Sequence, residues 1–248
     1  MKRSGFAGLL FCAAILFFLT SCGGNENKEQ TNTESNSTTA ASTSNAVIPE
    51  TNTIITTPQN MMIAIHRVSD FAKWKASYDE HDSMRLANGL HSYVIGRGLD
   101  DPNMVMVAVK ADDMAKAKAF AKDPALKKAM QKGGVIGTPS FSFIINTFQD
   151  TAVISSDIRS RTTFTVKDWD AWQKGFEEGK QERTNNGIVT RAYGHDPDDN
   201  KKVSLVTAVL DTAKAFAYYK SDELKKRREA SGVIGEPKRF MFRVVQRY

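Results

Sequence analysis

Along the chain, segments whose apolar residues are spaced as in a β-strand alternate with segments whose apolar residues are spaced as in an α-helix. Residues 61–68 are almost all apolar and predict a strand, which ends before Asp70, a residue suited to capping a helix. Apolar side chains then recur at the spacing of one helix face, and this helix is expected to end at Asn88-Gly89. The apolar face consists of Phe71, Trp74 and Tyr78.

The pattern continues with more strands and a second helix. An Asp-Asp-Pro-Asn turn separates the next two strands, and the second helix is expected to begin after Asp113, to be interrupted near Pro124 and to close at Gly134. The further strands lie near residues 91–97, 104–109 and 140–148. Strand, helix, strand, strand, helix, strand is the element order of a ferredoxin-like fold.

The whole pattern occurs twice. Displacing the sequence by 98 positions aligns residues 66–150 with residues 164–248 without a gap. Roughly two dozen identities over about 80 positions indicate a duplicated domain. The longest shared run, Gly-Val-Ile-Gly-x-Pro, lies at 134–139 and 232–237. Because each run follows a predicted helix, we interpret it as a structural joint into the last strand rather than as a phosphate-binding loop.

The two copies, residues 59–150 and 151–248, each have a sheet face without helices. Such a face must be covered, and two copies in one chain can press these faces together. With an Asp-x-x-x-Trp motif opening each first helix and the repeated Gly-Val turn, the chain resembles the dimeric α+β barrel superfamily, which includes small antibiotic-biosynthesis-monooxygenase-like domains. The resemblance implies an α+β fold in which two tandem ferredoxin-like (βαββαβ) domains form an intramolecular dimeric α+β barrel. It implies no single activity, since the superfamily includes monooxygenases, haem degraders, peroxidases, isomerases and proteins of no known activity.

The first 58 residues predict export and membrane attachment. Residues 1–21 open with Lys2 and Arg3, continue as an apolar run and end in Leu-Thr-Ser, as in a signal peptide. With the Cys22 that follows, this ending resembles the lipobox of bacterial lipoproteins, in which the signal is cleaved before the cysteine and the thiol carries lipid. An ordinary signal peptide followed by an incidental cysteine is the alternative. Residues 22–58 are rich in Asn, Thr and Ser, and we expect them to form a disordered tether.

These features place the protein in the cell envelope, lipid-anchored through Cys22 to a bacterial membrane, on its periplasmic or outer-membrane face. The membrane is therefore the first expected partner. The net charge of +6 comes from dispersed basic residues, so we expect no nucleic-acid partner. Duplication lets one chain complete the barrel, and either a monomer or a homodimer is consistent with it.

The sequence gives little indication of a reaction. The chain contains no nucleophile elbow, Walker loop or zinc-helix signature, so the sequence names no catalytic residue and leaves the cofactor unknown. The four histidines have no close ligand spacing, and we expect no metal site. They are His66, His81, His91 and His195.

The second strand of each copy supplies most of the candidate ligand-binding residues. Strict alternation places on one face His91, Tyr93, Ile95 and Arg97 of the first copy and Val189, Arg191, Tyr193 and His195 of the second. We expect this face to line the barrel, where an anionic or aromatic small molecule would bind to Tyr93, Arg97, Arg191, Tyr193 and His195. The alternative is that the face is exposed or fills the interface between the copies.

His81, on the first helix, is the sixth candidate for ligand binding. The second copy has Gly179 at the matching position. A residue present in only one copy can give a duplicated domain a one-sided site. An exposed helix histidine is the alternative.

Three functions remain open from the sequence. The first is a membrane-tethered protein that binds an anionic or aromatic small molecule in the barrel without transforming it. The second is a cofactor-independent or haem-handling enzyme of the monooxygenase-like group. The third is an interaction module whose bare sheet faces meet another envelope protein.

Overall fold

Two copies of one eight-element unit make up most of the described chain. A computed structural model describes residues 52–248; the predicted signal, Cys22 and most of the predicted tether lie outside these residues. The first copy contains β2 (Gln59–Val68), α1 (Phe71–Glu80), α2 (Asp82–Ala87), β3 (Leu90–Gly98), β4 (Met104–Ala111), α3 (Met114–Phe120), α4 (Pro124–Lys132) and β5 (Val135–Asp150). The second contains β6 (Ile158–Val166), α5 (Trp169–Glu178), α6 (Lys180–Asn185), β7 (Ile188–His195), β8 (Lys202–Val209), α7 (Thr212–Tyr219), α8 (Asp222–Ala230) and β9 (Val233–Arg247).

Aspartates shared by the two copies begin the helices. Asp70 and Asp168 cap α1 and α5, and Asp113 and Asp211 cap α3 and α7. Each of these side chains accepts a hydrogen bond from the backbone N–H three residues later. The predicted break near Pro124 is confirmed, because α3 ends before it and α4 starts at it.

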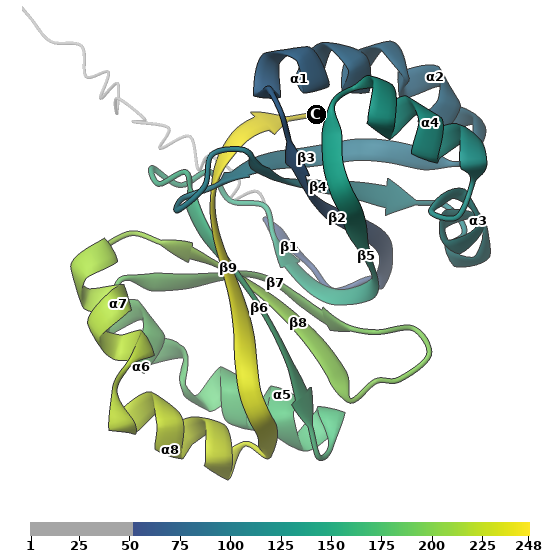
Figure 1. Cartoon of the computed structure of the whole chain (residues 1–248). Helices are drawn as coiled ribbons and strands as arrows, with labels where there is room; N and C mark the ends of the chain where they lie inside the picture. Colours follow the sequence, from purple (N-terminus) through teal and green to yellow (C-terminus); the bar gives the residue numbers. More distant parts are fainter. Residues whose placement is uncertain (1–51) are drawn as a thin grey trace, which may run out of the picture. The chain divides into compact units, whose positions relative to one another are not determined.

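The strands form one antiparallel sheet that closes on itself. Each copy has the ferredoxin-like strand order, β5-β2-β4-β3 and β9-β6-β8-β7. The copies join along two hydrogen-bonded seams, β3 with β9 and β5 with β7. None of these eight strands is therefore an edge strand, and the predicted fold, two tandem ferredoxin-like units in one α+β barrel, is confirmed (Figure 1).

The sheet is buried on both faces. Helices α1–α4 pack on the sheet of the first copy and α5–α8 on that of the second (Figure 1). The helix-side core of the first copy is built around Trp74, Leu90 and Ile95, and that of the second around Trp172 and Val203. A separate apolar cluster faces the barrel interior and consists of Met61, Ile63, Val94, Met106, Ala108, Ile144 and Phe242.

The last strand of each copy begins earlier than the sequence analysis expected. It starts directly after the helix-ending glycine, at Val135 in β5 and Val233 in β9, rather than near residue 140. Gly137 lies inside β5 with a φ of 74°, where the register between β2 and β5 shifts. The shared Gly-Val-Ile-Gly-x-Pro run is therefore a bulge within a strand, and glycine supplies the left-handed conformation that the bulge needs.

The end of the tether expected over residues 22–58 is ordered in part. Ile54 and Ile55 form the short strand β1 (Ile54–Ile55), which pairs with Gln149 and Asp150 of β5. These two apolar residues interrupt the polar composition on which the expectation rested. Each helix within residues 52–248 is too short or too polar to cross a membrane.

Candidate functional site

A β-bulge in the second strand of each copy changes which side chains share a face. The register of β3 against β4 and that of β7 against β8 both shift by one residue. The extra residues at these shifts are Tyr93 and Arg191. Because a bulge breaks the alternation of side chains, the face predicted from strict alternation is wrong beyond this point.

Tyr93 and Arg191 face the barrel interior, where both line a cavity of about 90 Å³. The Tyr93 hydroxyl accepts a hydrogen bond of 2.6 Å from Nε2 of Gln149. Arg191 joins the copies at the β5–β7 seam: its Nη1 lies 3.1 Å from Oδ2 of Asp150, and its Nη2 donates to the carbonyl of Ala152 at 2.6 Å.

Arg97, Tyr193 and His195 lie on the helix side of the sheet and do not line the barrel cavity. The guanidinium carbon of Arg97 is 4.3 Å from the ring centre of Phe71. Tyr193 is buried in the aromatic core of the second copy, and the His195 ring packs edge-on against Trp169. The five strand residues predicted to share one site are thus divided between the two faces of the sheet.

The first copy contains a second cavity, between its helices and its sheet. It encloses about 80 Å³, and the void reaches about 620 Å³ when the space open to solvent is included. An apolar cavity of about 150 Å³ holds benzene, so the enclosed part is limited to about one ring, and a larger ligand must extend into the part of the void that opens to solvent. The wall is largely apolar and includes Met62, Met84 and Met130, whose flexible side chains can move to admit a ligand.

His66 places a polar group in this wall. The residue is 4 % exposed and extends from β2 beside Met62 and Ala64. Neither ring nitrogen has a hydrogen-bond partner among residues 52–248, and the ring centre lies 5.5 Å from that of Trp74. Burial lowers the pKa of the imidazole from 6.5 to about 4. The ring is therefore neutral at neutral pH and offers one acceptor nitrogen and one N–H donor.

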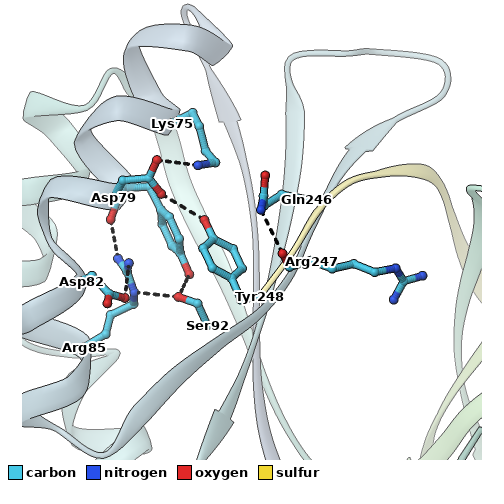
Figure 2. Close-up of polar contacts among 9 residues, drawn as sticks. Lys75, Asp79, Asp82, Arg85, Ser92, Gln246, Arg247 and Tyr248 are labelled. Atoms are coloured by element: carbon cyan, nitrogen blue, oxygen red, sulfur yellow. Dashed lines mark hydrogen bonds and ion pairs between the residues drawn. The ribbon is translucent and has the colours of Figure 1, made fainter. Parts of the chain in front are cut away.

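A polar network borders the cavity at the α1–α2 junction (Figure 2). The ring of Tyr78 stacks on that of Trp74 at 5.3 Å, and its hydroxyl is 2.7 Å from Oγ of Ser92. Arg85 donates to the carbonyl of Tyr78 at 2.7 Å and pairs with Asp82 at 2.9 Å. Burial raises the pKa of the Tyr78 hydroxyl, so this group remains a neutral phenol.

His81, a candidate from the sequence, lines the same cavity as His66. Its Nδ1 is 2.7 Å from the carbonyl oxygen of Ser77. Since a carbonyl oxygen only accepts, Nδ1 carries the proton in this contact, and Nε2 is the acceptor of the neutral ring. Two imidazoles thus border one apolar cavity.

The matching cavity of the second copy, also about 80 Å³, has no imidazole in its wall within the described residues. Phe164 stands where the first copy has His66, and Gly179 where it has His81. The second cavity is instead lined by several arginines, namely Arg183, Arg227, Arg228 and Arg239. The pair of histidines is therefore a one-sided feature of a duplicated fold.

Arg159 and Arg161 of β6 are absent from the candidates found in the sequence, yet both line the barrel cavity. Extending the repeat alignment a few residues toward the N-terminus places them opposite Met61 and Ile63, and this contrast is the signal that could have found them. For His66 the signal is its alternation with apolar residues on the helix-facing side of a strand. In the described part of the chain, no group of three or more His, Cys, Asp or Glu side chains is arranged to hold a metal ion.

No family model matches the sequence, and no curated protein matches it. Solved structures do match. A "putative monooxygenase" from Fusobacterium nucleatum subsp. nucleatum superposes with a TM-score of 0.52 at 14 % identity, over 76 % of this chain and 93 % of that one. An "anthrone oxidase-like protein" superposes with a TM-score of 0.52 at 14 % identity, over 78 % and 94 %. A "putative chlorite dismutase" superposes with a TM-score of 0.50 at 14 % identity, over 77 % and 96 %.

These structural neighbours are dimeric α+β barrel proteins of the antibiotic-biosynthesis-monooxygenase-like and chlorite-dismutase-like kinds. The fold resemblance predicted from the sequence is therefore confirmed. At this level of identity the similarity concerns the fold alone, because one fold carries many activities.

Proposed function

We propose that the chain is a cofactor-independent, monooxygenase-like enzyme that acts on a small aromatic substrate in the helix–sheet cavity of the first copy. The observation that carries the proposal is His66, a buried imidazole with no partner for either nitrogen among residues 52–248. A buried polar group without a partner costs free energy, and a substrate hydroxyl or carbonyl would supply that partner. The names of two structural neighbours, a "putative monooxygenase" and an "anthrone oxidase-like protein", suggest the reaction class.

In this proposal the substrate supplies the electrons. An aromatic compound with an acidic methylene group gives one proton to the free nitrogen of His66, and the resulting carbanion reduces dioxygen. One oxygen atom becomes a carbonyl oxygen on the former methylene carbon, and the other leaves as water. The second methylene proton and the proton held by His66 go into that water molecule, so no other reductant is needed.

The low pKa of His66 fits this role once the substrate is bound. In the empty cavity burial disfavours the imidazolium. A substrate anion beside the ring favours the protonated form, because an opposite charge at short range raises the pKa of an imidazole. His66 thus accepts a proton only when the substrate is there to give one.

Haem does not fit the cavity as its residues are arranged. The enclosed volume of about 80 Å³ is far smaller than a tetrapyrrole macrocycle, whereas the narrower fused rings of anthrone can extend from it into the part of the void that opens to solvent. The arginine in the wall, Arg85, is already bonded to Ser92, Asp82 and the carbonyl of Tyr78, so it is not free to bind a propionate. The reaction is therefore assigned to the substrate, dioxygen and the protein's own side chains.

The lipid predicted on Cys22 is part of this proposal. It would hold the barrel at a bacterial membrane in the cell envelope, where apolar aromatic compounds accumulate. Growth with labelled palmitate is expected to label the protein and to leave the Cys22→Ser variant unlabelled and released from the membrane fraction. Equal membrane retention of an unlabelled wild type would count against the lipid anchor.

Oxidation of anthrone tests the enzymatic activity. The full chain in detergent micelles is expected to convert anthrone and dioxygen to anthraquinone and water faster than the spontaneous reaction. His66→Phe, which installs the residue of the second copy, should lower kcat/KM by roughly a hundredfold, as loss of a general base commonly does. The matched control is His91→Val, because His91 is an exposed imidazole bonded to Asp112 and Val189 is its counterpart.

The control variant should retain the wild-type rate. Equal rates for the wild type and His66→Phe would exclude His66 as the base. A wild type that neither accelerates anthrone oxidation nor binds phenol in an NMR titration would exclude the proposed function altogether.

A further inference from the structure

The side chains that face the barrel interior differ in chemistry between the two copies. At the inward-facing positions of the first strand, the first copy has Met61 and Ile63 and the second copy has Arg159 and Arg161. Matched positions thus carry apolar side chains in one half of the barrel and guanidinium groups in the other. Such a cavity suits a ligand with an apolar part and an anionic part.

Arg161 is a buried guanidinium that meets no carboxylate in the described part of the chain. The residue is 6 % exposed, and neither Nε nor Nη2 has a hydrogen-bond partner among residues 52–248. Burial lowers the pKa of the group to about 10, so it remains charged at neutral pH. A buried charge with no partner is strongly destabilising, and a bound anion would remove this cost.

Positive charge is in excess around Arg161. Arg159 is 3 % exposed and donates to the carbonyls of Ser156 and Ile158, but it meets no carboxylate within the described residues. The side chains with full charge that line the cavity are Arg159, Arg161, Arg191, Arg247 and Asp150. The carboxylate of Asp150 is already paired with Arg191, so it does not neutralise the other arginines.

The cavity also has an opening and a free hydroxyl donor. Arg247 is exposed and lines the same cavity. In Figure 2 its side chain points away from that of Tyr248, which bonds to Asp79 of α1. The Tyr93 hydroxyl accepts from Gln149, which leaves its own O–H to donate to a ligand.

We propose that the barrel interior binds a small monocarboxylate, with its carboxylate on Arg161 and Arg159 and its apolar body against Met61, Ile63 and Phe242. The fork of a guanidinium matches the two oxygens of a carboxylate. Inorganic phosphate would leave the apolar half of the cavity without a partner. The volume of about 90 Å³ limits the body to a short chain or one ring. This site is separate from the cavity that contains His66.

Calorimetric titration of the full chain with butyrate and benzoate tests the site. Both carboxylates are expected to bind at least about tenfold more tightly than butyramide and benzamide, which lack the charge. Arg161→Ile installs the residue of the first copy and should weaken carboxylate binding by about tenfold or more. The same variant should raise the Tm of the ligand-free protein, because it removes an unpaired buried charge.

Two further variants make the test specific. Arg67→Ile removes an exposed arginine that pairs with Asp101 outside the cavity, and it should leave carboxylate affinity unchanged. Arg161→Lys keeps the charge but loses the fork, so it should bind carboxylates more weakly than the wild type, and it serves if Arg161→Ile does not fold. Both variants are measured with the same butyrate and benzoate titrations.

A wild type that binds neither carboxylate, or that binds them no better than Arg161→Ile does, would overturn the proposal. Tighter binding of inorganic phosphate than of benzoate would overturn the assignment to a monocarboxylate. His66→Phe should still bind benzoate, and Arg161→Ile should still oxidise anthrone. The outcome for this site is therefore independent of the outcome for the enzymatic activity.

Discussion

At the scale of single residues, the positions where the two copies differ carry the chemistry. His66 corresponds to Phe164, and Arg161 corresponds to Ile63. In each pair, one copy has a polar side chain where the other copy has an apolar one. Because buried polar atoms need partners, these differences indicate function, whereas identities such as the capping Asp70 indicate structure.

The buried imidazole of His66 predicts a specific loss of stability in acid. Its folded-state pKa of about 4 lies below the ordinary 6.5, so between these values the unfolded chain binds a proton that the folded chain does not. The free energy of unfolding should therefore fall as the pH drops from about 6.5 to about 4, by up to roughly 3 kcal/mol from this group, and the loss should level off below that.

Urea unfolding of the wild type and His66→Phe across this pH range measures the effect. The difference in unfolding free energy between the two proteins should shift in favour of His66→Phe as the pH falls from about 6.5 to about 4. Comparison with the variant removes the contribution of the carboxylates, which titrate in both proteins. Parallel curves would mean that His66 is not buried in its neutral form.

At the scale of elements, the second strand of each copy, β3 or β7, determines which side chains line the barrel and how closely the copies approach along the two seams. Its bulge directs Tyr93 or Arg191 into the barrel, and a shared glycine follows, at 96 or 194. A methyl group on Gly194 would lie 2.1 Å from the carbonyl oxygen of Ile145, and one on Gly96 would lie 2.3 Å from the ring of Phe242. Both seams therefore require the close approach that glycine allows.

Alanine at Gly194 should open or strain the β5–β7 seam. We expect Gly194→Ala to lower the free energy of unfolding by about 3 kcal/mol and Gly96→Ala by less, because a phenyl ring can shift more easily than a strand backbone. Thermal denaturation followed by circular dichroism measures both changes. Gly133→Ala is the control: Gly133 has a negative φ of −71°, and a methyl group there would lie 3.1 Å from the hydroxyl of Ser77, so a smaller loss than for Gly194→Ala is expected.

At the scale of the whole molecule, closure of the barrel depends on contacts between the copies. Besides the two seams, Arg191 of the second copy reaches Asp150, at the end of the first, and the carbonyl of Ala152 in the segment between β5 and β6. The side chains of Arg191 and Asp150 are 9 % and 15 % exposed, so the ion pair is largely shielded from water. Removing one partner of such a pair leaves a charge buried alone.

Arg191→Ala should therefore destabilise the barrel by about 3 kcal/mol or more. The matched control is Arg243→Ala, because Arg243 and Asp157 form an ion pair whose side chains are about half exposed, and such pairs contribute little. Chemical unfolding of both variants measures the difference. Equal stability of the two variants would mean that the Arg191 pair has no special part in closure.

Local sequence patterns predicted most of the elements, the repeat and the ferredoxin-like element order, and the family resemblance added the barrel; the starts of β5 and β9 and the short strand β1 were missed. Helix caps, apolar stripes and the order of strands depend on neighbours in the chain, and the duplication made each expectation testable against its copy. Of the six candidate ligand-binding residues, Tyr93 and Arg191 line the barrel cavity and His81 lines the cavity of the first copy. Arg97, Tyr193 and His195 lie elsewhere, and a role in ligand binding stays a prediction for all six.

The sequence by itself thus determined that two ferredoxin-like units are joined in one chain, and which positions differ between them. Only the tertiary structure decided which of those positions meet. A single inserted residue in β3 and in β7 turns the side chains that follow to the opposite face of the sheet. Neither the amino-acid composition nor the spacing of apolar residues reveals this insertion. Closure of the sheet then brings Arg161 of β6 and Met61 of β2 to one cavity, since pairing between strands far apart in the chain, rather than local propensity, sets the contents of a barrel.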